Sequence, residues 1–309
     1  MSPLPDAPRF GRVVTAMVTP FDDDGALDLD GAVQLARWLS AHGSDGLVLS
    51  GSTGESSVLT DEEKADLWRA VAEAVTIPVI AGSGSNDTEH SVKMTQLAKT
   101  CGVDGVLVVT PYYNRPSQAG LYEHFRVVAE AAGGLPVVLY DIPVRSGRRI
   151  AHSTLLRVAH DVPAAVALKD AAGDPAGTAH LAARVPAGFE IYSGDDIMTL
   201  PLLAVGAVGI ISVASHWIGP QFRAVVDAFM SGDLAGAIAG NRELLDSFDF
   251  EGSDEYPNPL PAKAACRALG LPVGQCRLPM GRATAELDAQ AAKIVAAVGH
   301  PRATDQQVG

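Results

Sequence analysis

Cysteine is scarce in this sequence, and its spacing excludes the common small-domain frameworks. Only three cysteines occur among 309 residues, at Cys101, Cys266 and Cys276. No C-x-x-C pair is present, so neither a zinc knuckle nor a disulfide scaffold is predicted. The eight histidines form no H-x-H or H-E-x-x-H pattern. A catalytic metal is therefore not expected.

Basic residues and long apolar runs are also in short supply. Lysine and arginine number 23 against 36 acidic residues, which gives 23 − 36 = −13. This balance disfavours binding to nucleic acid or to an anionic membrane surface. No uncharged apolar stretch approaches the ~18 residues of a membrane span, and residues 1–10 lack the apolar segment of a signal peptide. We therefore expect a soluble, reduced, cytoplasmic protein.

Apolar residues nevertheless make up 47% of the chain, enough for a large core. Eight short runs rich in Val, Ile and Leu show little period-two alternation, which is typical of strands buried on both faces of a parallel sheet. The runs are Val13–Val18, Gly46–Leu49, Ile77–Ala81, Val106–Val109, Leu135–Leu139, Ala164–Leu168, Phe189–Tyr192 and Val208–Val213.

Amphipathic segments separate these runs. One opens with a capping box at Thr60–Glu63, and another begins in the same way at Asn86–Glu89. The alternation repeats about eight times at ~20–30 residues per unit, which predicts a (β/α)8 TIM barrel. The alternative is a doubly wound open sheet, although Gly82-Ser83-Gly84 is too short for a dinucleotide-binding turn.

The chain is longer than a barrel requires. Residues after Ser212 contain four further helix-like stretches, separated by a polar, proline-rich connector at Gly252–Pro261. We therefore predict a catalytic barrel over residues 1–225, a C-terminal helical region over 226–300 and a polar tail over 301–309.

Residues at the carboxyl ends of barrel strands line the active site of this fold. Lys169 ends one apolar run, where desolvation would lower the pKa of its amine and favour Schiff-base formation with a ketone. A solvated lysine at a strand terminus is the alternative. Tyr140 ends the preceding run and could exchange a proton with a carbinolamine, or could simply fill space at the rim.

Two other strand-end turns have more than one interpretation. Ser52 and Thr53 lie in a glycine-flanked turn that could hold a carboxylate, or could be an ordinary turn. Asp195 and Asp196 follow a Ser-Gly turn and are interpreted as helix N-caps rather than ligands of a divalent ion.

The strand-end motifs together resemble the dihydrodipicolinate synthase (4-hydroxy-tetrahydrodipicolinate synthase) group. This group belongs to the class I pyruvate-dependent aldolase superfamily, which includes N-acetylneuraminate lyase. The resemblance covers about Gly11 to Ala296. Its motifs are Ala16–Phe21, Gly51–Ser56, Val109–Asn114, Leu139–Pro143, Lys169–Ala171, Ser193–Asp196, Asn258–Lys263 and Leu278–Met280.

The resemblance implies a role for individual residues. Lys169 matches the Schiff-base lysine and Tyr140 the proton donor and acceptor. Ser52 and Tyr113 match a hydroxyl relay, in which the second tyrosine reaches into a neighbouring subunit's site. Residues matching substrate-binding positions are Thr53, Ile211, Gly194 and Arg145, of which the arginine would bind the carboxylate of the aldehyde substrate.

The implied activity is condensation of pyruvate with L-aspartate 4-semialdehyde, in diaminopimelate and lysine biosynthesis. No cofactor is implied beyond the imine on Lys169, and the expected assembly is a homo-oligomer, dimer or tetramer. Ser52 stands where the synthases more usually have threonine, whereas Arg145 is generally absent from the sugar-acid lyases. The alternatives are an aldolase acting on another 2-keto acid, such as N-acetylneuraminate, and a catalytically silent metabolite sensor.

The resemblance also implies an inhibitory site for lysine at a subunit interface. Its positions match Ser56, Ser57, Asp61, Lys64, Asn86, His90 and Tyr112. Lysine-sensitive members carry a carboxylate where this chain has His90, and Lys64 would repel the ligand's ammonium group. We therefore expect feedback inhibition by lysine to be weak or absent.

Overall fold

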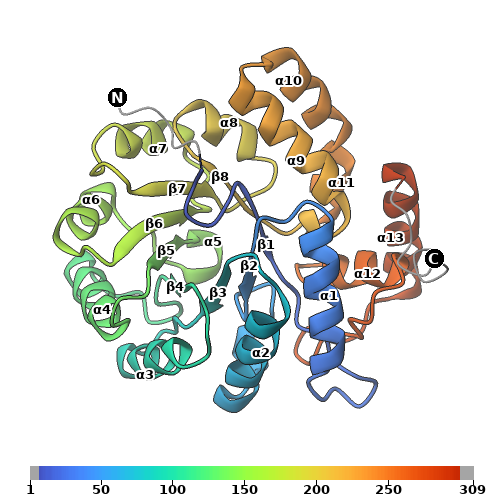
Figure 1. Cartoon of the computed structure of the whole chain (residues 1–309), viewed down its shortest axis with the longest axis horizontal. Helices are drawn as coiled ribbons and strands as arrows, with labels where there is room; N and C mark the ends of the chain where they lie inside the picture. The colour runs from blue at the N-terminus through green and yellow to red at the C-terminus, as the bar shows by residue number, and fades with distance from the viewer. Residues whose placement is uncertain (1–6, 300–309) are drawn as a thin grey trace.

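The computed structural model describes residues 7–299 and contains a closed barrel of eight parallel strands in chain order (Figure 1). β1 pairs with both β2 and β8, which closes the barrel. The strands are β1 (Val13–Ala16), β2 (Gly46–Leu49), β3 (Val79–Gly82), β4 (Gly105–Val109), β5 (Val137–Asp141), β6 (Ala165–Asp170), β7 (Glu190–Ser193) and β8 (Gly209–Ser212). The predicted TIM barrel is therefore confirmed, and each apolar run overlaps one strand.

The two faces of the strands explain why the apolar runs do not alternate with polar residues. Val138, Ala167 and Ile211 belong to a cluster inside the barrel. Their neighbours Leu139 and Leu168 point outward into a larger cluster packed against the helices. Both faces of each strand are thus buried, as expected for a parallel sheet covered by helices.

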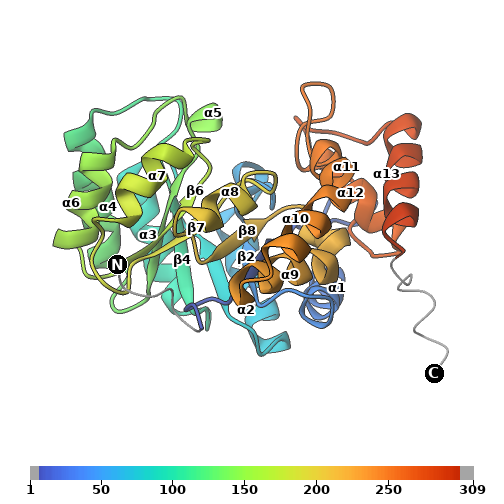
Figure 2. The same cartoon turned by 90° about the horizontal axis from the view of Figure 1, so that it is seen from above.

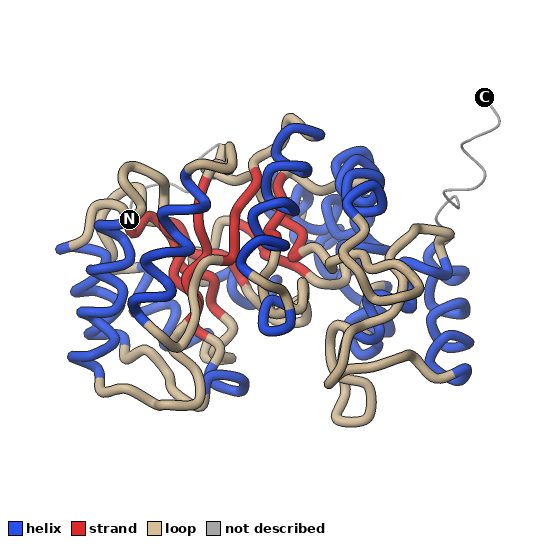
Figure 3. Tube along the Cα trace, turned by 90° about the horizontal axis from the view of Figure 1, so that it is seen from below, coloured by secondary structure: helices blue, strands red, loops and turns tan. Residues whose placement is uncertain are grey.

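The helices surround the barrel and continue beyond it (Figures 1 and 3). Around the barrel lie α1 (Leu29–Ala41), α2 (Asp61–Ala74), α3 (Thr88–Lys99), α4 (Gln118–Ala131), α5 (Pro143–Ser146), α6 (His152–Asp161), α7 (Pro175–Ala182), α8 (Thr199–Ala204) and α9 (Ser215–Ser231). The C-terminal region adds α10 (Leu234–Glu243), α11 (Leu245–Phe250), α12 (Leu260–Ala268) and α13 (Ala285–Val298). The predicted capping box is present at the start of α2, where Thr60 and Glu63 bond reciprocally.

Helices α11–α13 lie beside the barrel rather than around it (Figure 2). Residue 225, where we placed the barrel boundary, lies inside α9, so this helix belongs to both predicted regions. The predicted polar tail, residues 301–309, is outside the described residues. Among the described helices, none combines the length and the apolar character that a membrane span requires.

Candidate active site

The barrel's interior places Lys169 and Tyr140 side by side. Side chains alternate along a strand, so Lys169 points inward like Ala167, and Tyr140 like Val138. The two residues are also register partners on the paired strands β5 and β6. Each is the penultimate residue of its strand, whereas the apolar runs in the sequence ended two residues before the strands do. The Lys169 Nζ atom lies 4.4 Å from the centroid of the Tyr140 ring.

Burial makes Lys169 an unusually weak base. The side chain is 4% exposed, and the barrel interior desolvates its ammonium form. This burial lowers the pKa of Lys169 to about 8, with the nearby Asp196 carboxylate acting in the opposite direction. Roughly a tenth of the amine is therefore uncharged at pH 7 and available for nucleophilic attack, far more than for an ordinary lysine.

Tyr140 is buried to the same degree, and Ser52 lies within hydrogen-bonding reach of its phenol. Burial raises the pKa of Tyr140 well above its usual value, while Arg145 and the Ser52 hydrogen bond act to lower it. The phenol is therefore protonated at neutral pH and can donate or relay a proton. The structure thus brings together three of the predicted residues: Lys169, Tyr140 and Ser52.

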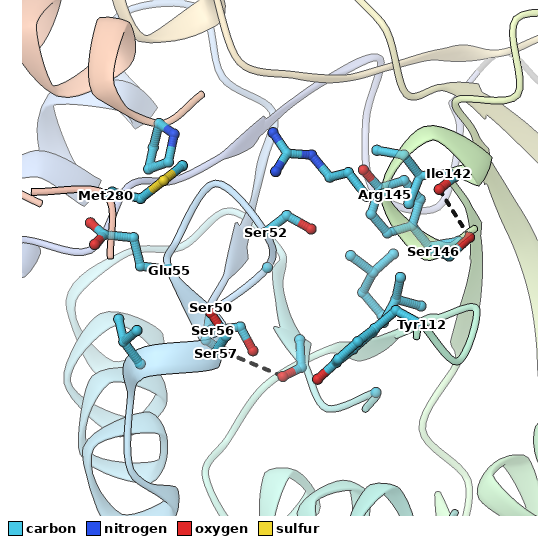
Figure 4. Close-up of a pocket in the computed structure, with 18 of the residues that line it drawn as sticks. Ser50, Ser52, Glu55, Ser56, Ser57, Tyr112, Ile142, Arg145, Ser146 and Met280 are labelled. Carbon is cyan, nitrogen blue, oxygen red and sulfur yellow. Dashed lines mark hydrogen bonds between the residues drawn. The ribbon is translucent and has the colours of Figure 1, made fainter. Parts of the chain in front are cut away.

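A cavity of about 320 Å³ opens beside these residues. Its wall includes Ser52, Tyr140 and Arg145, and it extends past Ser56, Ser57 and Tyr112 to Met280 (Figure 4). Lys169 is not one of the lining residues and is packed against the Tyr140 ring. Tyr140 therefore lies between the cavity and Lys169.

The turn after β2 is held by the C-terminal region. Asn258 donates a hydrogen bond from Nδ2 to Thr53 Oγ1 at 2.9 Å, and its carbonyl accepts one from Arg145 at 3.1 Å. Lys263, which is 0% exposed, pairs with Glu55 Oε1 at 2.7 Å. These contacts were not predicted from the sequence, where Gly252–Pro261 was interpreted as a connector and Asn258–Lys263 as a motif of the resemblance.

Gly194 lies against Lys169, and Ile211 lies in the barrel interior; neither residue lines the cavity. A Cβ atom at Gly194 would lie 2.9 Å from Lys169 Cγ, so any larger residue would displace the lysine stem. Ile211 is 1% exposed on the inner face of β8. Their predicted contacts with substrate therefore remain predictions, and the structure shows them as neighbours of the site.

Arg145 is exposed but points across the cavity mouth from α5 (Figure 4). It lines the cavity and influences both Lys169 and Tyr140 through its charge. A guanidinium in this position can bind a carboxylate in bidentate fashion.

Tyr113 is not brought into the cavity of its own chain. The residue is 89% exposed, and its backbone adopts a left-handed conformation with φ of 72°. A non-glycine residue in this region is strained, and such strain is typical of functional positions. The side chain points to solvent, where a neighbouring subunit could receive it.

The Asp195 side chain accepts hydrogen bonds from the backbone N–H groups of Ile197 and Met198 directly before α8, although α8 itself starts without a side-chain cap. Asp196 Oδ2 accepts the backbone N–H groups of Val213 and Ala214, at 2.9 and 2.7 Å, just before α9. Glu251 lies within hydrogen-bonding reach of Asp196. This acidic residue was not singled out from the sequence.

Within residues 7–299, no group of three or more His, Cys, Asp or Glu side chains is arranged to hold a metal ion. The free cysteines Cys101, Cys266 and Cys276 are all buried. The side chains that the structure brings together at this site supply an amine, a phenol and a hydroxyl.

Comparison with known proteins places the chain in one family. Residues 9–298 match the model of the dihydrodipicolinate synthetase family. A 4-hydroxy-tetrahydrodipicolinate synthase of Moorella thermoacetica is 50% identical over 292 residues, covering 94% of this chain and 98% of the relative.

Solved structures agree with that match. A dihydrodipicolinate synthase from Bacillus anthracis is 41% identical with a TM-score of 0.90, covering 96% of this chain and 100% of its own. One from Cyanidioschyzon merolae with lysine bound is 42% identical with a TM-score of 0.91, covering 94% and 98%. The chain therefore belongs to the dihydrodipicolinate synthetase family.

Proposed function

We propose that this protein is a 4-hydroxy-tetrahydrodipicolinate synthase, a lyase that condenses pyruvate with L-aspartate 4-semialdehyde in diaminopimelate and lysine biosynthesis. The observation that carries the proposal is Lys169, a buried amine with a lowered pKa beside Tyr140. The chain is 50% identical to an enzyme of that name, which supports the choice of substrates.

The reaction begins at the amine of Lys169. Its lone pair attacks the ketone carbon of pyruvate, and a proton from Tyr140 converts the departing hydroxyl to water, which leaves an imine. The imine withdraws electrons, so a methyl proton is removed more easily and an enamine forms. The enamine carbon attacks the aldehyde, and the product's own amino group then displaces Lys169 as the ring closes.

The surrounding residues position the two substrates. Ser52 passes protons between Tyr140 and solvent, and Tyr113 of a neighbouring subunit completes this relay. Thr53 and Ile211 contact the pyruvate portion, Gly194 leaves room beside the lysine, and Arg145 binds the carboxylate of the semialdehyde.

Because Lys169 itself acts as the electron sink, the reaction requires neither a metal ion nor an organic cofactor. EDTA should leave the rate unchanged. The role of Tyr113 requires a homo-oligomer, either a dimer or a tetramer, since its side chain lies away from the cavity of its own chain.

The second candidate is an aldolase that uses another 2-keto acid, and the exposed position of Arg145 is the observation that favours it. A steady-state assay decides between them by comparing pyruvate plus aspartate semialdehyde with pyruvate plus N-acetylmannosamine. The proposal requires turnover of the first pair and at most trace turnover of the second. Preference for the second pair would overturn it.

A further inference from the structure

Two carboxyl groups meet close to Lys169, one from the barrel and one from the C-terminal region. Asp196 follows β7 at the carboxyl end of the barrel, and Glu251 follows the last turn of α11. The two side chains are within hydrogen-bonding reach of each other. Both act on Lys169 through their charges, so the pair belongs to the electrostatic surroundings of the catalytic amine.

Each carboxyl group leaves one buried oxygen without a donor. Asp196 Oδ1 and Glu251 Oε2 are both inaccessible to solvent, and neither has a hydrogen-bond donor as long as both groups are ionised. Two carboxylates cannot satisfy each other, because neither has a proton to donate. A single proton placed between them satisfies both buried oxygens at once.

The proton belongs on Glu251 rather than on Asp196. Asp196 Oδ2 already accepts two backbone N–H groups, from Val213 and Ala214, and such bonds stabilise a carboxylate. We propose that Glu251 is a neutral acid that donates its proton to Asp196, and that this shared proton positions the β7–α8 turn while limiting the negative charge beside Lys169 to one. Glu251 is then a positioning residue contributed by the C-terminal region.

The charges around the pair favour this arrangement. Burial raises the pKa of Glu251 well above its ordinary value, and the neighbouring carboxylates Asp196 and Asp195 raise it further, against the opposing effect of Lys169. A second negative charge here would stabilise the ammonium form of Lys169. A neutral Glu251 instead lets the amine lose its proton at lower pH, as imine formation requires.

The first test rests on the proposed function of Lys169 as nucleophile. The initial rate of imine formation with pyruvate is measured across about pH 6 to 10, with each aliquot quenched into borohydride at one fixed pH. The variants are Glu251→Gln, Glu251→Ala and, as a matched control four residues further along the chain, Glu255→Gln, which is exposed.

If Glu251 and Asp196 share a proton, the pH midpoint of imine formation in Glu251→Gln should lie within about 0.3 pH unit of the wild-type midpoint. The reason is that an uncharged amide replaces an uncharged acid and still donates to Asp196. Glu251→Ala should slow imine formation, whereas Glu251→Gln should form the imine at about the wild-type rate. If Glu251 is ionised, the glutamine removes a negative charge, and the midpoint falls by about one unit or more. That shift would overturn the proposal.

The second test does not depend on imine chemistry. A carboxyl group whose folded-state pKa is raised stabilises the fold less as pH rises above the unfolded pKa of ~4.3. The difference in unfolding free energy, wild type minus Glu251→Gln, should therefore decrease with rising pH. A difference that is flat, or that rises with pH, contradicts the shared proton. Absence of any wild-type adduct on Lys169 would instead count against the proposed function alone.

Discussion

Lys169 acquires its chemistry from its position in one strand. The alternation of side chains along β6 points it into the barrel, and the register with β5 sets it against Tyr140. The same residue on an exposed loop would retain the pKa of ordinary lysine and remain protonated at neutral pH. Position in the fold, more than residue type, therefore lowers the pKa of this amine and suits it to the proposed role of nucleophile.

Ser52 offers a test of the proton relay at the scale of one hydroxyl. Ser52→Ala should lower kcat by roughly 10²–10⁴-fold, the usual contribution of a general acid–base group. Ser52→Thr should retain most activity, because threonine keeps the hydroxyl that reaches Tyr140. Steady-state kinetics on both variants, with the exposed and remote Ser231→Ala as control, provides the measurement. An unchanged kcat in Ser52→Ala would remove Ser52 from the mechanism.

Sequence reasoning identified Lys169 and Tyr140 because each ends an apolar run, and strand ends form the site in a barrel. It missed Glu251, because nothing in the local pattern around this residue distinguishes it from the exposed acids that follow. Its significance comes from burial against Asp196, which the chain reaches only by folding α11 back toward the barrel. Long-range burial of a polar group has no short-range sequence signal.

Among the elements, the turn after β2 depends on the C-terminal region for its shape. Glu55 has a left-handed backbone, with φ of 54°, and its carboxylate meets buried Lys263 and the backbone N–H of Arg277. Arg277 also binds Glu63 in α2. Lys263 of α12 and Arg277 of the loop between α12 and α13 therefore hold the turn that carries Ser52 and Thr53.

Breaking the buried ion pair between Glu55 and Lys263 should destabilise the fold. Lys263→Met should lower the free energy of unfolding by about 3–5 kcal/mol, because it leaves the Glu55 carboxylate buried without its cation. Urea denaturation measures the change, with exposed Lys99→Met as a control expected to stay within about 0.5 kcal/mol.

Adding Glu55→Gln to Lys263→Met should recover part of the loss, since the second change removes the unpaired charge. If the double variant is as unstable as the sum of its single changes, the ion pair does not account for the effect.

The apolar runs located all eight strands because each is buried on both faces. Three short helices, α5, α8 and α11, were not predicted. They span four to six residues, too few for a helical period to show in the sequence. Their conformation follows from packing at the barrel rim and beside α10.

At the scale of the whole molecule, the proposed role of exposed Tyr113 makes oligomerisation a requirement for activity. Tyr113→Phe and Lys169→Ala should each be strongly impaired alone. Mixed after dissociation and reassembly, they should regain about a quarter of wild-type activity, because half of the random dimers contain one intact site out of two. Sedimentation analysis of the mixture confirms reassembly. No recovery in a reassembled mixture would show that Tyr113 does not act across subunits.

Charge at the predicted inhibitor site sets the expected response to lysine. Asp61 already binds His90 Nε2 and Lys93 Nζ, each at 2.8 Å, so its carboxylate is engaged. Lys64 is buried nearby, and burial lowers the pKa of its amine while Asp61 raises it. A lysine ligand would thus lie near the amines of Lys64 and Lys93. It would find His90 at the position where lysine-sensitive members have a carboxylate.

Lysine should therefore inhibit weakly or not at all in an initial-rate titration at sub-saturating pyruvate. His90→Glu would supply the missing carboxylate and should increase sensitivity. The relative from Cyanidioschyzon merolae, whose structure contains bound lysine, is a useful comparison in the same assay. Half-inhibition of the wild type at submillimolar lysine would show that the charge argument is wrong.

The central claim is that Lys169 forms an imine with pyruvate, and borohydride trapping tests it most directly. Incubation with pyruvate and borohydride, followed by peptide mapping, should show a three-carbon fragment attached irreversibly to Lys169 and loss of activity in proportion to labelling. Lys169→Ala should take up no label. A label on another lysine, or no label on an active enzyme, would contradict the account.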